Sequence, residues 1–222
     1  MTRVYSVAEA EKFIKANTES LPIIEKKWDF TENTTATEGE NEPVVSGSAT
    51  WNETNQNIKF NANVTAPGIL SLKLNPAIGN KANVNFDLYV GALGGQTFTY
   101  TINDSEGTNL VNCSFNVYNG TGSMVIGSEE IAVDSDVASA VSKVSGDGMS
   151  SSVTQVSNEI NFASNTVTVN IGSKSFTGKL TGAETGLISD ISFKSERSKK
   201  ADRSIYLDNL VVREYETDSS DT

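Results

Sequence analysis

The chain contains no histidine, and this absence removes several kinds of catalytic site. Histidine is the usual base that activates serine and cysteine nucleophiles, and it is a frequent zinc ligand. The single cysteine, Cys113, falls on the apolar side of an alternating run, so we expect a small buried side chain rather than a reactive thiol. No glycine-rich phosphate loop of the common kinds occurs.

Glycoside hydrolysis needs only two carboxyl groups, so the lack of histidine does not exclude it. Glu129 and Glu130 are adjacent in the sequence, a spacing that does not match the acids of lectin-like glucanases. Asp134 and Asp136 lack the Asp-x-Asp-x-Asp-Gly pattern of a calcium loop, and Asp87 is a lone acid on a polar strand face. The acidic residues therefore predict no enzyme.

Two sets of amides and tyrosines recur on the polar sides of alternating runs. One set is Asn85, Asp87 and Tyr89, and the other is Asn112, Asn116 and Tyr118. Amides offer fixed donors and acceptors to sugar hydroxyls, and a tyrosine ring offers a flat surface to the C–H face of a sugar. We expect the two sets to share one sheet face that binds a ligand; the alternative is a face that only keeps the protein soluble.

Two tryptophans are further candidates. Trp51 precedes the polar turn 52–57, so it either stands exposed at a loop tip as a binding residue or packs into the core. Trp28 lies at the start of the alternating region and is expected in the core.

The elements that position these residues are short strands. From Trp28 onward, apolar and polar residues alternate, which is typical of half-buried antiparallel strands. Turn residues separate the runs. The apolar sides are Ile58, Phe60, Ala62 and Val64; Val84, Phe86, Leu88 and Val90; Phe98, Tyr100 and Ile102; Val111, Cys113, Phe115 and Val117; and Val167, Val169 and Ile171. The pattern predicts an all-β, two-sheet antiparallel jelly-roll sandwich over 28–216, with an irregular insertion at about 127–157 and a frayed tail at 217–222.

Residues 6–16 give the one good helix signal. Ser6 and Glu9 form a capping box, and the following apolar residues share one helical face. We therefore expect a short N-terminal helix and a connecting segment over 1–27.

Bulk composition limits the partners. The chain has 222 residues, 17 basic and 28 acidic, for a formal net charge of −11. Such a surface repels phosphate backbones and anionic membrane surfaces, so no nucleic acid is expected. No stretch reaches about 18 consecutive apolar residues, so no membrane insertion is expected. The densest basic run is diluted by Glu196 and Asp202 and is interpreted as a solvated loop: Lys194, Arg197, Lys199, Lys200 and Arg203.

The two ends of the sandwich carry a family resemblance. Lys27-Trp28-Asp29-Phe30 opens it, and Ser204-Ile205-Tyr206-Leu207-Asp208-Asn209-Leu210-Val211-Val212 closes it. The closing strand, aromatic-aliphatic-Asp-Asn-aliphatic-x-Val, resembles the last strand of jelly-roll carbohydrate-binding modules of bacterial glycanases and pectinases. The stretch 28–216 is similar in organisation to these modules and to lectin-like sandwiches.

The resemblance implies a non-catalytic module that binds polysaccharide. Since the start of the chain lacks a signal-peptide pattern, we expect either a cytoplasmic protein or, preferably, one domain of a larger extracellular or cell-surface chain. The alternative function is an adhesin, surface-layer or virion domain that mediates protein contacts.

In such modules a structural calcium often links the first strand to the last. Carried over by position, this implies calcium ligands at Asp29 and Asp208. The alternative is that Asp208 accepts backbone donors at a β-bulge, because the alternation slips between Leu207 and Leu210.

Overall fold

The computed structural model describes residues 21–33, 40–61, 66–90, 96–116, 121–133, 153–182, 186–197 and 204–216. Regular structure in these residues is entirely β. The helix expected over 6–16 lies outside the described residues, and so does the tail 217–222. Within the described ranges, no helix is long and apolar enough to cross a membrane.

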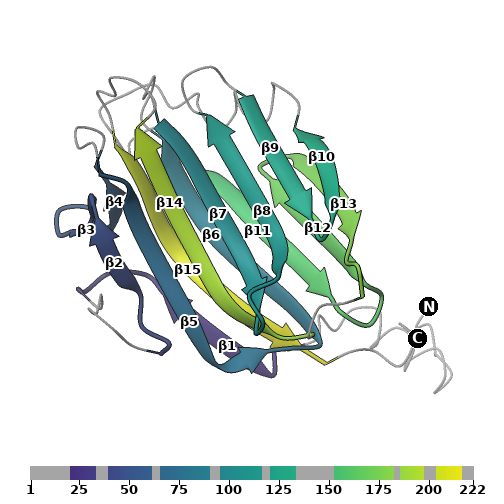
Figure 1. The fold of residues 1–222 in the computed structure, drawn as a ribbon. Coiled ribbons are helices and arrows are strands. Elements are labelled where there is room, and N and C mark those ends of the chain that lie inside the picture. The colour runs from purple at the N-terminus through teal and green to yellow at the C-terminus, as the bar shows by residue number, and fades with distance from the viewer. Residues whose placement is uncertain are drawn as a thin grey trace, which may run out of the picture.

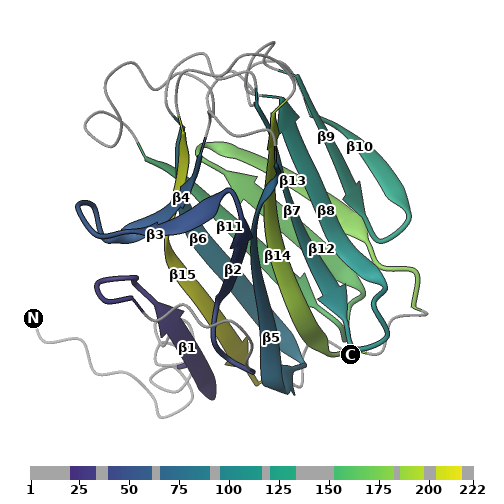
Figure 2. The same ribbon diagram turned by 60° about the vertical axis from the view of Figure 1, so that its left-hand side comes forward.

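The strands form two antiparallel sheets packed face to face, which confirms the predicted sandwich (Figures 1 and 2). The eight-stranded sheet has the order β13-β12-β11-β6-β15-β4-β3, with β1 also paired to β15. Its members are β1 (Ile24–Trp28), β3 (Ala49–Asn52), β4 (Asn57–Phe60), β6 (Lys81–Val90), β11 (Thr154–Asn161), β12 (Thr166–Ile171), β13 (Lys174–Lys179) and β15 (Ile205–Tyr215).

The seven-stranded sheet has the order β10-β9-β8-β7-β14-β5-β2. Its members are β2 (Val44–Gly47), β5 (Gly68–Ile78), β7 (Gln96–Asp104), β8 (Asn109–Asn116), β9 (Thr121–Ile126), β10 (Glu129–Val133) and β14 (Ile188–Arg197). β10 and the start of β11 fall within the insertion expected at about 127–157, so part of that segment is regular sheet. Residues 134–152, which include Asp134 and Asp136, lie outside the described ranges.

The core lies between the sheets and is made by the apolar sides of the alternating runs. Four aromatic rings form its centre: Phe86–Phe193 and Phe86–Tyr100 centroids are 5.0 and 5.1 Å apart, both edge to face, and Phe98 stacks on Phe193 at 6.3 Å. Burying a side chain of this size stabilises the fold by about 1.5–3 kcal/mol. The expected core residues whose burial the structure describes are buried; Val90 is not among these, and Ala62, Val64 and Val117 lie outside the described ranges.

The core also contains polar side chains, and these are buried between the sheets. Cys113 is buried, and this burial raises the pKa of its thiol to about 12, as expected for an unreactive side chain. The Tyr100 hydroxyl donates to Asn158 Oδ1 at 2.9 Å, and Asn158 Nδ2 donates to the Val84 carbonyl at 3.0 Å. This buried chain of hydrogen bonds joins β7 of one sheet to β11 and β6 of the other.

β15 carries the irregularity that shapes the site. It pairs with β6 along both of its ends, but its register shifts between Asp208 and Val211, so that Asn209 and Leu210 lie opposite the single residue Phe86. Asn209 has a φ of 49°, which asparagine tolerates better than most residues. The predicted slip in alternation is therefore a real β-bulge.

On the other side of β15 the bulge lies between two partners. Pairing with β4 ends at Leu207, and pairing with β1 begins at Leu210. The bulge also changes which alternate positions of β15 point outward. Before the bulge these are the even-numbered residues Tyr206 and Asp208, and after it they are the odd-numbered residues Arg213 and Tyr215.

Candidate functional site

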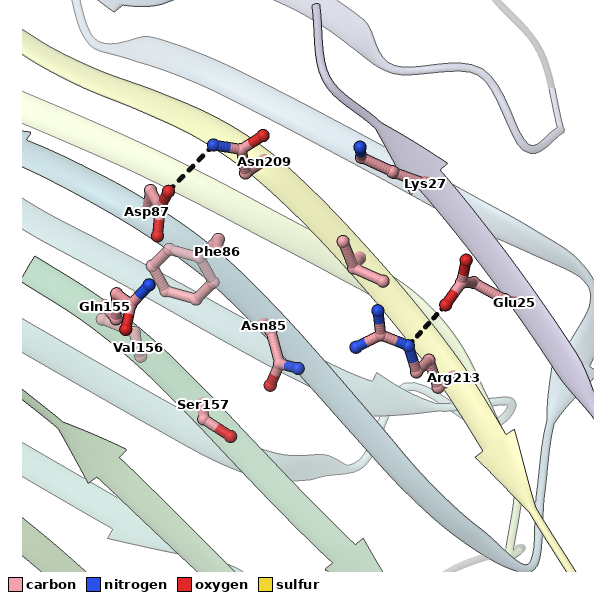
Figure 3. Close-up of a pocket in the computed structure, with 11 residues that line it drawn as sticks. Glu25, Lys27, Asn85, Phe86, Asp87, Gln155, Val156, Ser157, Asn209 and Arg213 are labelled. Atoms are coloured by element: carbon pink, nitrogen blue, oxygen red, sulfur yellow. Dashed lines mark hydrogen bonds and ion pairs between the residues drawn. The ribbon is translucent and has the colours of Figure 1, made fainter. Parts of the chain in front are cut away.

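Two adjacent grooves hollow the outer face of the eight-stranded sheet. The first, here called the bulge groove, has a volume of about 580 Å³ and crosses β1, β15, β6 and β11 beside Asn209. The second, the end groove, has a volume of about 600 Å³ and continues past Lys81 and Tyr215. Figure 3 shows the bulge groove with the side chains of Asn85, Asp87 and Gln155 around it.

Charges in these grooves are balanced. The bulge groove is lined by Glu25 and Asp87 against Lys27 and Arg213. In the end groove, the two acidic residues Glu25 and Glu159 are matched by the two basic residues Lys81 and Arg213. Arg213 Nε is paired with Glu25 Oε2 at 2.5 Å, and this ion pair lines both grooves (Figure 3). The lining therefore suits an uncharged polar ligand better than an ion of either sign.

Two amides beneath the grooves lack a hydrogen-bond partner on their oxygens. Asn85 lines the bulge groove and Asn83 lines the end groove, and Oδ1 of each is buried with no partner among the described residues. A buried acceptor without a donor costs about 1–3 kcal/mol. A half-turn of the terminal torsion exchanges the oxygen and nitrogen of an amide, so a bound hydroxyl can satisfy either group.

Acidic residues meet at the bulge. Asp208 lies directly opposite Asp87 in the β15–β6 pairing. Asn209 holds both carboxylates: its Nδ2 donates to Asp87 Oδ2 at 2.9 Å, and its backbone N–H donates to Asp208 Oδ1 at 2.7 Å. The pKa of Asp208 is raised to about 6, chiefly by burial and in addition by the charges of Asp87 and Asp29, against the opposing effects of the Asn209 hydrogen bond and the Lys27 charge.

The acids expected to bind calcium are thus neighbours but are already engaged. Asp29 is exposed, and its Oδ1 accepts the backbone N–H of Thr31 at 3.3 Å and the Thr31 hydroxyl at 3.0 Å. These hydrogen bonds lower the pKa of Asp29. No group of three or more acidic, cysteine or histidine side chains able to hold a metal occurs in the part of the chain that the structure describes. The predicted bulge role of Asp208, as acceptor of a backbone donor, is confirmed.

The expectation of one shared Asn/Tyr face is wrong. Asn85, Asp87 and Tyr89 lie on β6 in the eight-stranded sheet, whereas Asn112 and Asn116 lie on β8 in the seven-stranded sheet. The polar sides of the two strands face outward on opposite sides of the sandwich. Alternation shows which side of a strand is polar, but it does not show which sheet the strand joins.

Tyr118, the last member of the second set, lies outside the described residues.

The tryptophans pack against the core. Trp51 is half-buried, and its indole N–H donates to the Phe30 carbonyl at 3.0 Å. Trp28 is also half-buried and donates to the Asn41 carbonyl at 3.1 Å. The structure supports the core alternative for Trp51, not a binding residue at a loop tip.

Sequence reasoning missed several groove residues. Asn83 continues the polar side of β6 and was within reach of the same pattern. Arg213 and Glu25 were not recognisable, because their meeting depends on β1 pairing with β15 across most of the sequence.

Comparison with solved structures places this fold among lectin-like sandwiches. The carbohydrate recognition domain of Emp47p is similar with a TM-score of 0.58 and 12% identity, over 86% of this chain and 95% of that one. A Bacillus subtilis protein of unknown function with a galectin-like fold has a TM-score of 0.55 and 8% identity, over 90% and 99% of the two chains. No family model and no curated protein matches the sequence.

A sialidase is also similar, with a TM-score of 0.55 and 12% identity over 78% of this chain, but the match spans only 17% of the sialidase. At these identities the likeness concerns the fold alone. It confirms the lectin-like sandwich that the closing strand predicted.

Proposed function

We propose that this protein binds a neutral polysaccharide, without turnover, in the two grooves of the eight-stranded sheet. The observation that carries the proposal is a pair of grooves with balanced charges and amide oxygens that lack donors. After the half-turn that brings these oxygens to the grooves, sugar hydroxyls donate to them without bringing a net charge. The carbohydrate recognition domain of Emp47p, which has the same fold, supports this assignment.

The affinity should be modest. The grooves lie on an open sheet face and offer a few hydrogen bonds rather than an enclosed pocket. Each hydrogen bond contributes about 0.5–1.5 kcal/mol net, so a handful of them gives dissociation constants of about micromolar to millimolar.

The positions of the carboxylates in the grooved face agree with binding without catalysis. Asp87 and Asp208 lie on neighbouring strands of one face, and Asn209 holds both of them. Glycosidases instead place two carboxyl groups on either side of the scissile bond. Release of new reducing ends from a bound polysaccharide would contradict this part of the proposal.

Affinity electrophoresis against neutral plant polysaccharides, such as xylan, galactan, arabinan and glucomannan, tests the site. We expect retardation on at least one polymer, and Asn85→Ala should reduce it by removing a groove amide. Asn112→Ala is the matched control, because Asn112 is a half-buried outward amide on the opposite sheet. Retardation lost in the Asn112 variant but kept in the Asn85 variant would move the site to the seven-stranded sheet.

We also propose that a calcium ion stabilises the bulge between Asp29 and Asp208. Asp29 and Asp87 both lie near enough to Asp208 for their charges to raise its pKa, although the described residues hold no group of three or more such side chains placed to hold a metal. Carboxylate oxygens are the donors that calcium prefers, and water would complete the coordination. An ion at this position would offset the repulsion and raise the melting temperature of the folded chain.

The setting that we propose is an extracellular or cell-surface protein in which this domain is one of several. The alternative is an adhesin, surface-layer or virion domain that binds protein. The domains encoded beside this chain in its full-length gene would distinguish them: a glycanase or lyase neighbour supports polysaccharide binding, and tandem adhesive repeats support the alternative.

A further inference from the structure

We propose that the site takes an internal stretch of an extended polysaccharide chain lying along β6 and β15, and that Tyr206 and Tyr89 form its aromatic end. This inference rests on the proposed function and specifies the shape of the glycan. It adds Tyr206, which sequence reasoning did not select.

The two tyrosines are a cross-strand pair. Tyr206 of β15 is the register partner of Tyr89 of β6, and both side chains are half-buried on the outer face. Burial, followed by the charges of Asp87 and Asp208, raises the pKa of the Tyr89 phenol. The phenol therefore lies close to the acid pair that borders the bulge groove.

The tyrosine pair and the grooves are continuous along β6. Every second residue of this strand points outward, and the strand rises about 3.4 Å per residue, so the outward row spans roughly 27 Å from Tyr89 to Lys81. The row passes from the tyrosine pair through the bulge groove to the end groove: Tyr89, Asp87, Asn85, Asn83 and Lys81. A surface of this length exceeds a single sugar and suits several linked units.

The grooves also repeat the same chemistry. Each has one β6 amide whose oxygen lacks a partner among the described residues, Asn85 in the bulge groove and Asn83 in the end groove. These residues are two positions apart, which corresponds to roughly 7 Å along the strand. The Glu25–Arg213 ion pair lines both grooves. Similar groups at regular spacing fit a polymer whose units repeat.

The tyrosine pair adds aromatic surface beyond that of the grooves. The bulge groove is lined mainly by amides and charged groups, and the end groove adds a single tyrosine, Tyr215, whereas Tyr206 and Tyr89 bring two tyrosines to directly paired positions on adjacent strands. Lys59 is the register partner of Tyr206 on its other side and bounds the pair. Sugar rings pack their C–H faces on such aromatic surfaces.

Titration calorimetry with oligosaccharides cut from the retained polymer tests this inference. We expect an octasaccharide to bind at least about tenfold more tightly than a disaccharide, because it reaches both grooves and the tyrosine pair. Tyr206→Ala should weaken octasaccharide binding about fivefold, as expected for the loss of one aromatic contact, and Tyr206→Phe should preserve it.

The outcomes separate the two proposals. Equal affinity for the disaccharide and octasaccharide, or an unchanged octasaccharide affinity in a folded Tyr206→Ala variant, overturns the extended site and leaves groove binding intact. Melting curves of Tyr206→Ala and Tyr206→Phe show whether each variant folds. If Tyr206→Ala does not fold, Tyr89→Ala carries the same expectation. Absence of binding to every polysaccharide overturns both proposals.

Discussion

At the scale of single residues, the pairing of Asp87 with Asp208 is an electrostatically unfavourable feature of the fold. Like charges directly opposite each other on a sheet destabilise it, and these carboxylates are register partners. Asn209 relieves part of the repulsion by donating to both. Burial, and to a lesser extent the charges of Asp87 and Asp29, still raise the pKa of Asp208 to about 6.

Asp208→Asn should therefore stabilise the protein at neutral pH. The pKa of Asp208 is higher in the folded state than in the unfolded state, so the folded chain binds this proton more tightly. The contribution is fully present below the unfolded pKa, near 4, and is lost as the pH rises through about 6. Because Asp208 is only half-buried, we expect a gain of about 1 kcal/mol or less at pH 7.5.

Urea unfolding at pH 5 and pH 7.5 measures this effect. The asparagine retains an oxygen for the Asn209 N–H, and Glu53→Gln, an exposed acid in the β3–β4 turn, serves as the control. A variant that is less stable than the parent at pH 7.5 would show that the Asp208 carboxylate stabilises the bulge more than its repulsion from Asp87 destabilises it.

Calcium should raise the melting temperature of the parent protein relative to chelator, by an amount that grows with calcium concentration. Asp208→Asn and Asp29→Asn should each remove most of this increase, because each removes a charged oxygen ligand. Magnesium is the comparison ion, since it loses its water ligands reluctantly. Identical scanning-calorimetry curves of the parent in chelator and in excess calcium would exclude the ion.

At the scale of elements, two hairpin turns contain glycines of the same conformation, and these glycines can be compared. Gly127 joins β9 to β10 and Gly172 joins β12 to β13; both are followed by serine, with φ values of 55° and 56°. A Cβ at Gly127 would lie 2.6 Å from the Lys179 carbonyl oxygen, whereas a Cβ at Gly172 meets nothing within 4 Å.

Gly127→Ala should therefore destabilise the protein more than Gly172→Ala. Both variants bear the cost of left-handed backbone, about 1–2 kcal/mol, and the first also displaces the neighbouring β13 backbone. Chemical unfolding of both variants measures the difference. Equal losses would mean that the end of β13 shifts freely at this point.

The same elements show how far the sequence could be read. Alternation identified the buried sides of β6, β7, β8 and β12, and the slip around Asp208 located the bulge, because both depend on local spacing. Strand partners depend on contacts between distant segments. For this reason the separation of Asn85 from Asn112, and the meeting of Glu25 with Arg213, were not predictable. β5 was also missed, although its buried and exposed residues alternate over much of its length.

At the scale of the whole molecule, two sheets cover one aromatic core and leave two outward faces of different character. The outer face of the seven-stranded sheet pairs hydroxyls across its strands, as in Thr99 with Ser114 at 3.1 Å. Asn103, at the end of β7, also has a buried amide oxygen without a partner among the described residues. The grooved face of the eight-stranded sheet instead places two such oxygens, of Asn83 and Asn85, on one strand beneath the grooves. This asymmetry favours the grooved face for binding.

The net charge of −11 gives the last prediction. Charges within the grooves balance, so affinity for a neutral polysaccharide should be nearly independent of salt between about 20 and 500 mM, a range over which the Debye length falls from roughly 20 Å to 4 Å. An acidic polymer such as polygalacturonate would meet the repulsion of the whole surface at low salt, where screening is weakest. Affinity electrophoresis at both salt concentrations, with the two polymers side by side and calcium removed, measures this directly. Stronger binding of polygalacturonate at low salt would show that Lys27, Lys81 and Arg213 dominate the grooves, and the ligand would then be an anionic glycan.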